Sequence, residues 1–145
     1  MVAYSFEDVN ATIVGPGGAI TLGNGSGAAE EGITIDMEED KDRMTIGADG
    51  SVMHSLHAGK AGTMTFRILK TSPTNALLQA MYDLQTTSSA LWGINVIMVS
   101  NIANGDNVAG RSVAFRRQSP LVYAKDGNIN EWPFNAGMID RILGA

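Results

Sequence analysis

The sequence predicts a mainly β protein: an antiparallel β-sandwich or small barrel with one flanking α-helix, at about residues 72–86, and a long projecting hairpin, at about residues 38–61. Three observations support this fold class. Short runs of alternating apolar and polar residues are separated by turns, and seventeen glycines stand against four prolines, which is typical of a turn-rich β architecture. One stretch, residues 62–91, passes from a clear strand into a clear helix. A tight-turn signal also lies inside a long segment between two strands.

The strand at residues 63–69 has two different faces. Apolar and polar residues alternate along it as expected when one face is buried and the other is in solvent: Met64, Phe66 and Ile68 against Thr63, Thr65 and Arg67. Ser72 is a good N-cap and Pro73 suits the first helical position. The helical spacing that follows predicts a buried face and a polar face: Ala76, Leu77, Ala80, Met81 and Leu84 against Gln79, Asp83 and Gln85.

The projecting hairpin follows a second two-faced strand, residues 33–37. Residues 48–51 give a tight-turn signal between the short apolar runs 44–46 and 52–54. We interpret residues 38–61 as an extended arm that has too little of its own domain nearby to bury these apolar residues. Projecting apolar arms usually contact a neighbouring chain.

The remaining strands are predicted from shorter patterns. A first strand reaches Ile13, and residues 19–22 return from a glycine-rich turn. Residues 93–99 are nearly all apolar, which indicates a strand buried on both faces. Further strands are expected at residues 108–118, from Val122 onward and in the C-terminal residues, where Pro133 is tolerable only at an edge or a bulge. We expect residues 1–145 to form a single domain.

Composition limits the function classes. No cysteine is present, which excludes a disulfide framework and thiolate chemistry. No basic leader or long apolar run occurs, so we expect a soluble chain that does not insert into a membrane. Fifteen acidic against ten basic residues give a net charge of -5, which argues against gripping nucleic acid through its phosphates.

The charge is also uneven. Seven of the fifteen acids lie within residues 30–42, where Lys41 is the only base. This acidic band is either a surface for a partner or simply a solvated face. Arg111, Arg116 and Arg117 make residues 108–118 locally basic. Three arginines on an acidic domain are too few for nucleic acid, so we expect them to contact the acidic band of another subunit.

No catalytic, metal or cofactor site is predicted. Residues 23–29 resemble a glycine-rich phosphate loop but lack the following helix and the Lys-Ser or Lys-Thr of a P-loop. His54 and His57 are three residues apart but lack further ligands at the usual spacing. No nucleophile elbow or paired-carboxylate pattern is present.

Several segments, taken together and in this order, resemble the tail tube proteins of contractile-tailed bacteriophages. The resemblance covers nearly the whole chain, and its motifs are structural rather than catalytic. The segments are GITIDMEEDKD at 32–42, GADG at 47–50, HSLH at 54–57 with Gly59, TFRILKTSPTN at 65–75, YAKDG at 123–127 and EWPFNAG at 131–137.

The resemblance implies a structural virion protein, with no enzymatic activity and no cofactor. It implies that six copies form a ring whose inner strands join into a continuous β-barrel, and that rings stack into the tube through which phage DNA passes. The partners implied are other copies of the chain, the tail sheath, the tape-measure and baseplate proteins, and double-stranded DNA in transit. The location implied is the virion tail, after assembly in the host cytoplasm. An acidic wall suits such a conduit, because it repels phosphates.

Three sets of residues receive roles on this resemblance. The candidate lumen face is Thr34, Asp36, Glu38, Thr63, Thr65 and Arg67, where the positive charge of Arg67 leaves either its orientation or its neutralisation by Asp36 open. The candidate inter-ring hairpin residues are Asp42, Met44, Ile46, Val52, Met53, His54, Leu56 and His57. The candidate subunit contacts are Arg111, Arg116 and Arg117, and the helix is placed on the outer wall.

Two alternatives remain open at this point. The chain could be the tube subunit of a bacteriocin or of a type VI-like secretion particle, a relative of the same family. It could also be a small β-barrel that holds an apolar ligand, in which case a stable monomer would bind apolar dyes saturably in one pocket.

Overall fold

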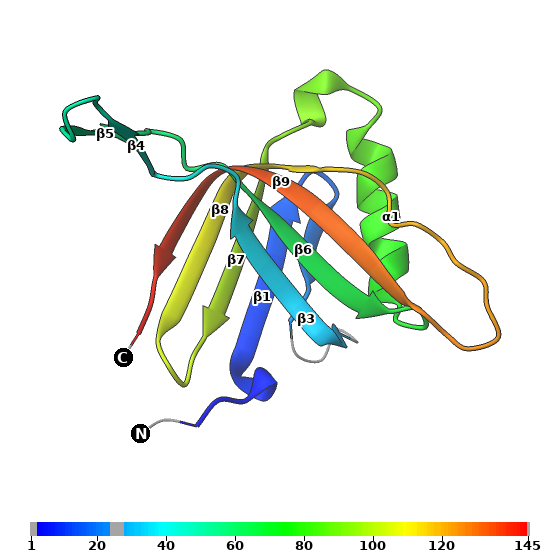
Figure 1. Cartoon of the computed structure of the whole chain (residues 1–145). Coiled ribbons are helices and arrows are strands. Elements are labelled where there is room, and N and C mark those ends of the chain that lie inside the picture. The colour runs from blue at the N-terminus through cyan, green and yellow to red at the C-terminus, as the bar shows by residue number, and fades with distance from the viewer. Residues whose placement is uncertain (1–2, 24–27, 145) are drawn as a thin grey trace.

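The computed structural model describes residues 3–23 and 28–144, and Figure 1 shows the course of the chain. The elements in chain order are η1 Phe6–Asp8, β1 Val9–Gly15, β2 Gly18–Thr21, β3 Ala28–Met37, β4 Asp42–Ile46, β5 Val52–Leu56, β6 Gly62–Leu69, α1 Thr74–Gln85, η2 Ser89–Leu91, β7 Asn95–Asn101, β8 Asp106–Phe115 and β9 Ile129–Ile142. The mainly β, antiparallel fold class with a flanking helix and a projecting hairpin is confirmed.

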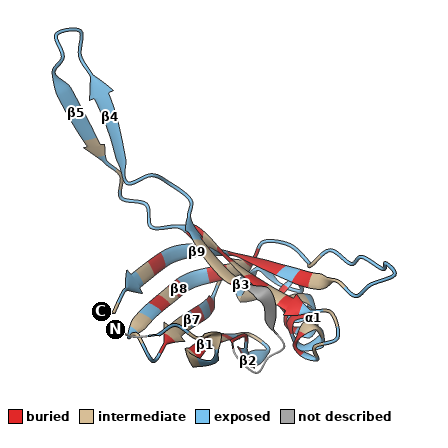
Figure 2. Ribbon diagram, turned by 60° about the horizontal axis from the view of Figure 1, so that its bottom comes forward, coloured by how far each residue is buried: buried red, intermediate tan, exposed pale blue. Residues whose placement is uncertain are grey.

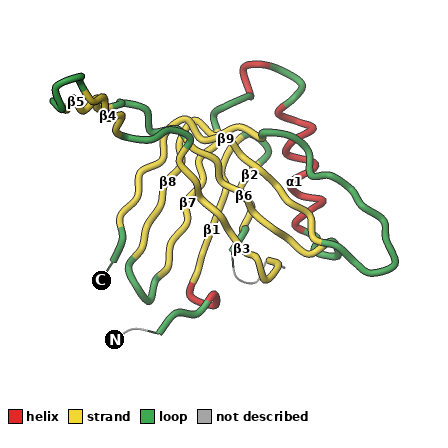
Figure 3. The backbone as a smooth tube through the Cα atoms, in the orientation of Figure 1, coloured by secondary structure: helices red, strands yellow, loops and turns green. Residues whose placement is uncertain are grey.

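Strand β9 organises the sheet. Within the described residues the strands form one seven-stranded antiparallel sheet in the order β2-β1-β7-β8-β9-β6-β3. The first part of β9 pairs with β6, from Ile129 to Ala136, and the last part pairs with β8, from Phe134 to Ile142. The sheet bends where these two parts meet, so β3 and β6 lie over the strands of the other half (Figures 1 and 3). The result has the layered character of a sandwich although its strands belong to one sheet.

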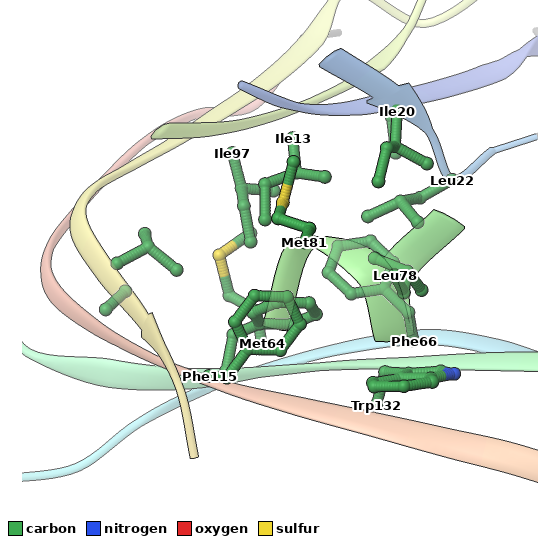
Figure 4. Close-up of a cluster of buried hydrophobic side chains, with 14 of the residues drawn as sticks. Ile13, Ile20, Leu22, Met64, Phe66, Leu78, Met81, Ile97, Phe115 and Trp132 are labelled. Carbon is green, nitrogen blue, oxygen red and sulfur yellow. The ribbon is translucent and has the colours of Figure 1, made fainter. Parts of the chain in front are cut away.

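The hydrophobic core lies between the two halves and under α1 (Figure 4). Strand β6 contributes Met64, Phe66 and Ile68, all fully buried as the alternation predicted. Phe66 packs edge-to-face against Phe134 of β9, with ring centroids 5.7 Å apart. Aromatic pairs in this geometry add stability beyond the apolar area that they bury. The position of β6 and β9 is therefore fixed by well-packed side chains.

Helix α1 lies where the sequence predicts it, and Met81 is buried as predicted, but the rest of the predicted buried face is wrong. Leu78 and Gln85 are buried, whereas Leu77 and Leu84 are largely exposed. The start also differs by one residue: Pro73 occupies the N-cap position, and the hydroxyl of Ser72 accepts a hydrogen bond from the amide of Thr74. A rotation of one residue about the helix axis moves each side chain by about 100°, which is enough to exchange the two leucine positions.

Strand β7 is not buried on both faces. Asn95 and Ile97 point into the core, whereas Val96 and Met98 lie on the outer face and are exposed. Met98 was expected in the core and is 60% exposed. The prediction failed because a nearly continuous apolar run does not distinguish a strand buried in its own chain from one whose second face is covered by another molecule.

The segment between β8 and β9 also differs from expectation. Residues 116–128 form no strand, so the strand expected at Val122 is absent from this part of the described chain. Pro133 lies inside β9, and its carbonyl accepts a hydrogen bond from the amide of Arg116, just after β8 ends. The N–H and C=O of one residue point to the same neighbour in an antiparallel ladder. An N–H at position 133 would therefore point toward Arg116, which lies beyond the last residue of β8. The proline thus removes no hydrogen bond from the paired part of the two strands.

The hairpin β4–β5 projects far from the rest of the molecule (Figure 2). It leaves the sheet where β3 ends and β6 begins, and the amide of Glu38 donates to the carbonyl of Ala61 at its base. Within the described residues, β4 and β5 pair only with each other. No helix in the described part of the chain is long and apolar enough to cross a lipid bilayer.

Candidate assembly surfaces

The two strands of the projecting hairpin place different side chains on its two faces. Directly paired residues share a face, and the register pairs Asp42 with Leu56, Met44 with His54, and Ile46 with Val52. We call this the apolar face of the hairpin: Asp42, Met44, Ile46, Val52, His54 and Leu56. The opposite face carries Arg43, Thr45, Met53 and Ser55. Met53 thus lies apart from the other apolar residues that were assigned to the inter-ring contact.

The apolar face is unusually exposed for its composition. The exposed fractions are 54% for Met44, 62% for Ile46, 52% for Val52 and 82% for Leu56. Exposing four large apolar side chains to water on one face of a projecting arm is unfavourable, because fully burying each of them would stabilise the protein by about 1.5–3 kcal/mol. An exposed patch of this kind marks a surface that contacts another molecule.

Polar contacts hold the hairpin in shape. His54 Nδ1 lies 2.9 Å from Asp42 Oδ2 across the strands, and His57 Nδ1 lies 3.0 Å from the carbonyl oxygen of Asp40. At the tip, hydrogen bonds from the Ser51 side chain and amide lower the pKa of Asp49. Both histidines therefore have structural partners, and the described residues contain no cluster of side chains suited to a metal ion.

The candidate lumen residues share the outer face of β3 and β6. Thr34 pairs directly with Thr65, and Asp36 pairs with Thr63, so four of the six lie side by side with their side chains away from the core. Glu38 follows the end of β3 and is exposed. The structure thus gathers these residues on one polar face.

Arg67 on this face is neutralised, but by a different residue from the one expected. Its Nη1 donates to Thr34 Oγ1 at 2.7 Å, and its Nε lies 3.4 Å from Glu131 Oε1 on β9. Asp36, the partner considered from the sequence, lies further along β3, opposite Thr63. Two neighbours therefore hold the guanidinium of Arg67 in place, and one of them carries the opposite charge.

The three arginines do not form one patch. Arg111 on the outer face of β8 pairs with Asp140 of β9 and also donates to Met138 Sδ. The hydrogen bond from Arg111, together with the nearby charge of Lys60, lowers the pKa of Asp140. Arg116 and Arg117 lie beyond β8 and are exposed, and neither forms an ion pair with the described residues. Of the three arginines predicted to contact another subunit, Arg116 and Arg117 therefore have no ion-pair partner among the described residues.

Two surfaces were missed by the sequence analysis. The outer face of β1 and β7 exposes Val14, Val96 and Met98. A cleft of about 580 Å³ also opens beside the core, between β3 and the ends of β7, β8 and β9. The apolar run of β7 indicates that both faces of the strand are covered, but it does not reveal that one of them lies outside the subunit. The cleft depends on the bend of the sheet and has no local sequence signal. The glycine-rich residues 24–27, considered for phosphate binding, lie outside the described residues.

The comparisons with known proteins agree with a tube subunit. The sequence model of the family described as "Bacteriophage PhiTE tail tube protein" matches residues 1–144. A search of curated protein sequences found no match.

Solved structures share the fold at low sequence identity. A chain of an extracellular contractile injection system, in the PVC sheath-tube complex in its extended state, has a TM-score of 0.62 at 11% identity and covers 97% of this chain and 92% of its own. The PVC sheath/tube terminator gives 0.58 at 12% identity and covers 98% of both chains. The tube-terminating cap of the anti-feeding prophage gives 0.57 at 13% identity and covers 99% of this chain and 95% of its own.

These findings agree with the two-faced strands, the flanking helix and the projecting arm, all of which are structural features. The family match spans nearly the whole chain rather than one motif. The chain therefore belongs to the PhiTE-type bacteriophage tail tube family and is a structural component of the virion tail.

Proposed function

We propose that six copies of this chain form a ring, that rings stack into the inner tail tube, and that double-stranded DNA passes through its bore. The edges of the sheet support lateral closure: β2 and β3 each have one neighbouring strand within the described sheet. Open sheet edges invite pairing with another chain, and closing a sheet into a barrel removes them. The whole chain would then act as a single tail tube domain.

The observation that carries the proposal is the hairpin. Its apolar face has no partner within the described residues, and the polar contacts of Asp42 and His54 keep that face in a defined shape. A ring whose subunits each project such an arm along the tube axis can bury its apolar face against a second ring. We assign the inter-ring contact to the apolar face rather than to the face of Met53.

The test compares one substitution on each face of the hairpin. Purified protein is examined by negative-stain electron microscopy and light scattering at low and high concentration, where the proposal predicts hollow rings or tubes of uniform diameter. Ile46→Asp should abolish stacking, whereas Thr45→Asp on the opposite face should stack as the unmodified protein does. A strictly monomeric protein at every concentration would refute the proposal, and normal tubes from Ile46→Asp would refute the role of the apolar face.

The lumen assignment has its own test. The chain contains no cysteine, so a single introduced thiol can be labelled without background. In assembled tubes, Asp36→Cys should react with a small maleimide that enters the bore but not with a large polymer-linked maleimide. Leu77→Cys, on the exposed face of α1, should react with both reagents. Equal reaction of both variants with the large reagent would place Asp36 outside the lumen.

The proposed partners follow from the family and from similar structures. Proteins of this fold occur in a sheath-tube complex and in the anti-feeding prophage baseplate, which supports contacts with a sheath and a baseplate here. We also propose contacts with a tape-measure protein, and assembly in the host cytoplasm. The same geometry would serve a bacteriocin or secretion particle. The family is a structural one, and we propose no enzymatic activity for this chain.

A further inference from the structure

The cleft beside the core is an opening in the apolar interior. Seven of its lining residues carry aliphatic or phenyl side chains, and they come from the N-terminal residues, from β3, from β7 and β8, and from the C-terminal residues: Phe6, Val9, Ile33, Ile35, Val99, Val108 and Leu143. Ile33, Ile35 and Val99 pack against the buried core but are themselves only partly buried. The cleft is therefore a place where the core reaches the surface. A complementary apolar surface would complete its burial.

The cleft and the hairpin lie at opposite ends of the molecule. The hairpin begins near the bend of β9, since Gly62 pairs with Ala136. The cleft is lined by Arg141 and Leu143, at the far end of the same strand. Seven residues of strand separate Ala136 from Leu143, about 23 Å at 3.3 Å per residue. Figures 1 and 2 both show the hairpin on the side away from the two termini.

This placement fits a head-to-tail contact between copies. A second copy displaced along this direction brings its hairpin to the cleft of the first, and its own cleft stays free for a third copy. A contact between two different surfaces of the same protein repeats without closing on itself when no rotation intervenes. Such a contact therefore builds a stack.

Charge favours the same pairing. Two charged residues line the cleft, Arg141 and Asp106. Asp106 Oδ1 accepts a hydrogen bond from the amide of Gly144 at 2.8 Å and is partly buried, whereas Arg141 is exposed and forms no ion pair with the described residues. The segment that leads into the hairpin, residues 38–42, carries four acids and one lysine. Opposite charges at the rim of an apolar contact guide its orientation.

We propose that the cleft of one copy receives the apolar face of the hairpin from a copy in the adjacent ring. This inference rests on the proposed stacking of rings and adds the surface that receives the hairpin. It assigns the receiving role to Ile33 and Ile35 on the core side of β3 and to the ends of β7, β8 and β9, none of which received a contact role from the sequence. It also assigns Arg141, rather than Arg116 or Arg117, to the axial contact.

A disulfide test distinguishes this contact from other ways of stacking. The double variant Ile46→Cys/Leu143→Cys places one thiol on the apolar face and one in the cleft, at positions that are both more than 60% exposed, so neither change should affect folding. The control Thr45→Cys/Leu143→Cys moves the first thiol to the opposite face. Both variants are assembled under reducing conditions, checked for tubes by electron microscopy, oxidised mildly and separated on a denaturing gel.

The apolar-face variant should give a ladder of covalent dimers, trimers and longer chains, and the control at least about tenfold less. Tubes without a ladder, also with a second pair, Val52→Cys/Arg141→Cys, would overturn the inference and leave stacking itself intact. Ladders of equal intensity in test and control would overturn it too. If the unmodified protein forms no tubes, both this inference and the proposed function fail.

Discussion

A buried pair of amides connects the helix to the sheet. Gln85 at the end of α1 and Asn95 at the start of β7 are both fully buried. Each side-chain nitrogen donates to the other's oxygen, at 2.7 and 2.8 Å, and Gln85 also donates to the carbonyl of Pro16 at 3.0 Å. Gly15 leaves the space for this arrangement, because a Cβ at that position would lie 1.7 Å from Asn95 Oδ1.

Asn95→Ala should lower the free energy of unfolding by about 1–3 kcal/mol, because it leaves the buried amide of Gln85 without its partner. Urea denaturation followed by tryptophan fluorescence measures the change. Asn107→Ala, at an exposed position on β8, is the matched control and should change stability by less than about 0.5 kcal/mol. Equal effects of the two substitutions would contradict a structural role for the amide pair.

The ion pair between Arg111 and Asp140 on the outer face determines the direction in which the pKa of Asp140 should change when the pair is removed. The hydrogen bond from Arg111 lowers the pKa of Asp140 below its ordinary value of 3.8. A carboxyl whose pKa is lower in the folded state contributes stability above the unfolded pKa and loses it as pH falls through the folded pKa. Arg111→Gln should therefore raise the pKa of Asp140 toward its ordinary value, as measured by NMR titration. Lys60→Gln should raise it less, and an unchanged pKa in Arg111→Gln would refute the pair.

The same residues show what a sequence can and cannot predict at this scale. Gln85 was placed on the exposed face because a glutamine is rarely buried, and nothing local reveals that Asn95 will satisfy it ten residues later. Leu77 and Leu78 are adjacent leucines, and the sequence alone does not indicate which of the two is buried. The choice between them is made by tertiary packing.

At the scale of elements, the hairpin differs from every strand that packs on the core. β4 and β5 pair only with each other within the described residues, and an isolated two-stranded hairpin is marginally stable in water. Its backbone amides should therefore exchange rapidly with deuterium in the free subunit and become protected in assembled tubes. The amides of β6 should be slow in both states. Hydrogen exchange with mass spectrometry reads both elements at once, and unchanged exchange of residues 42–56 on assembly would contradict the inter-ring role.

Removing the hairpin should leave the rest of the fold intact. The amide of His57 donates to the carbonyl of Lys41 at 2.9 Å, the geometry that a two-residue Asn-Gly turn can close. Replacing residues 42–56 with Asn-Gly should give a folded protein that does not stack, with a urea midpoint close to that of the full chain. A large loss of stability would show that the hairpin supports its own subunit.

The alternation of apolar and polar residues predicted those strands that bury one face in the core of the same subunit and expose the other. This pattern located β3 and β6 and the two faces of each, because successive side chains of a strand point to opposite faces of the sheet. It did not predict the bend of β9, which is a property of the sheet. Beside that bend Ser112 of β8 has a positive φ of 53°, at the point where the register between β7 and β8 shifts. A bulge of this kind has no clear local signal in the sequence.

The whole molecule makes sense only as part of an assembly. Its open sheet edges, its exposed hairpin and its cleft all leave polar backbone groups or apolar side chains in water in an isolated subunit, and in the proposed assembly each of them would be covered by another copy. The residues on these surfaces could be found from the sequence when they formed a pattern along the chain, as in the hairpin. The cleft could not, because its lining residues come from segments that are distant in the sequence.

The salt dependence of tube formation should distinguish charge interactions between subunits from the apolar hairpin contact. Each subunit carries a net charge of -5, so bringing many copies together costs repulsion between like charges, and the screening length falls from roughly 10 Å at 0.1 M to 3 Å at 1 M. The apolar hairpin contact does not weaken on screening. The critical concentration for tube formation should therefore fall as sodium chloride rises from about 0.05 to 0.5 M, as measured by light scattering over a dilution series. The variant Arg116→Gln/Arg117→Gln makes each subunit more negative and should show a steeper fall. A critical concentration that rises with salt would show instead that attraction between opposite charges on neighbouring subunits governs assembly.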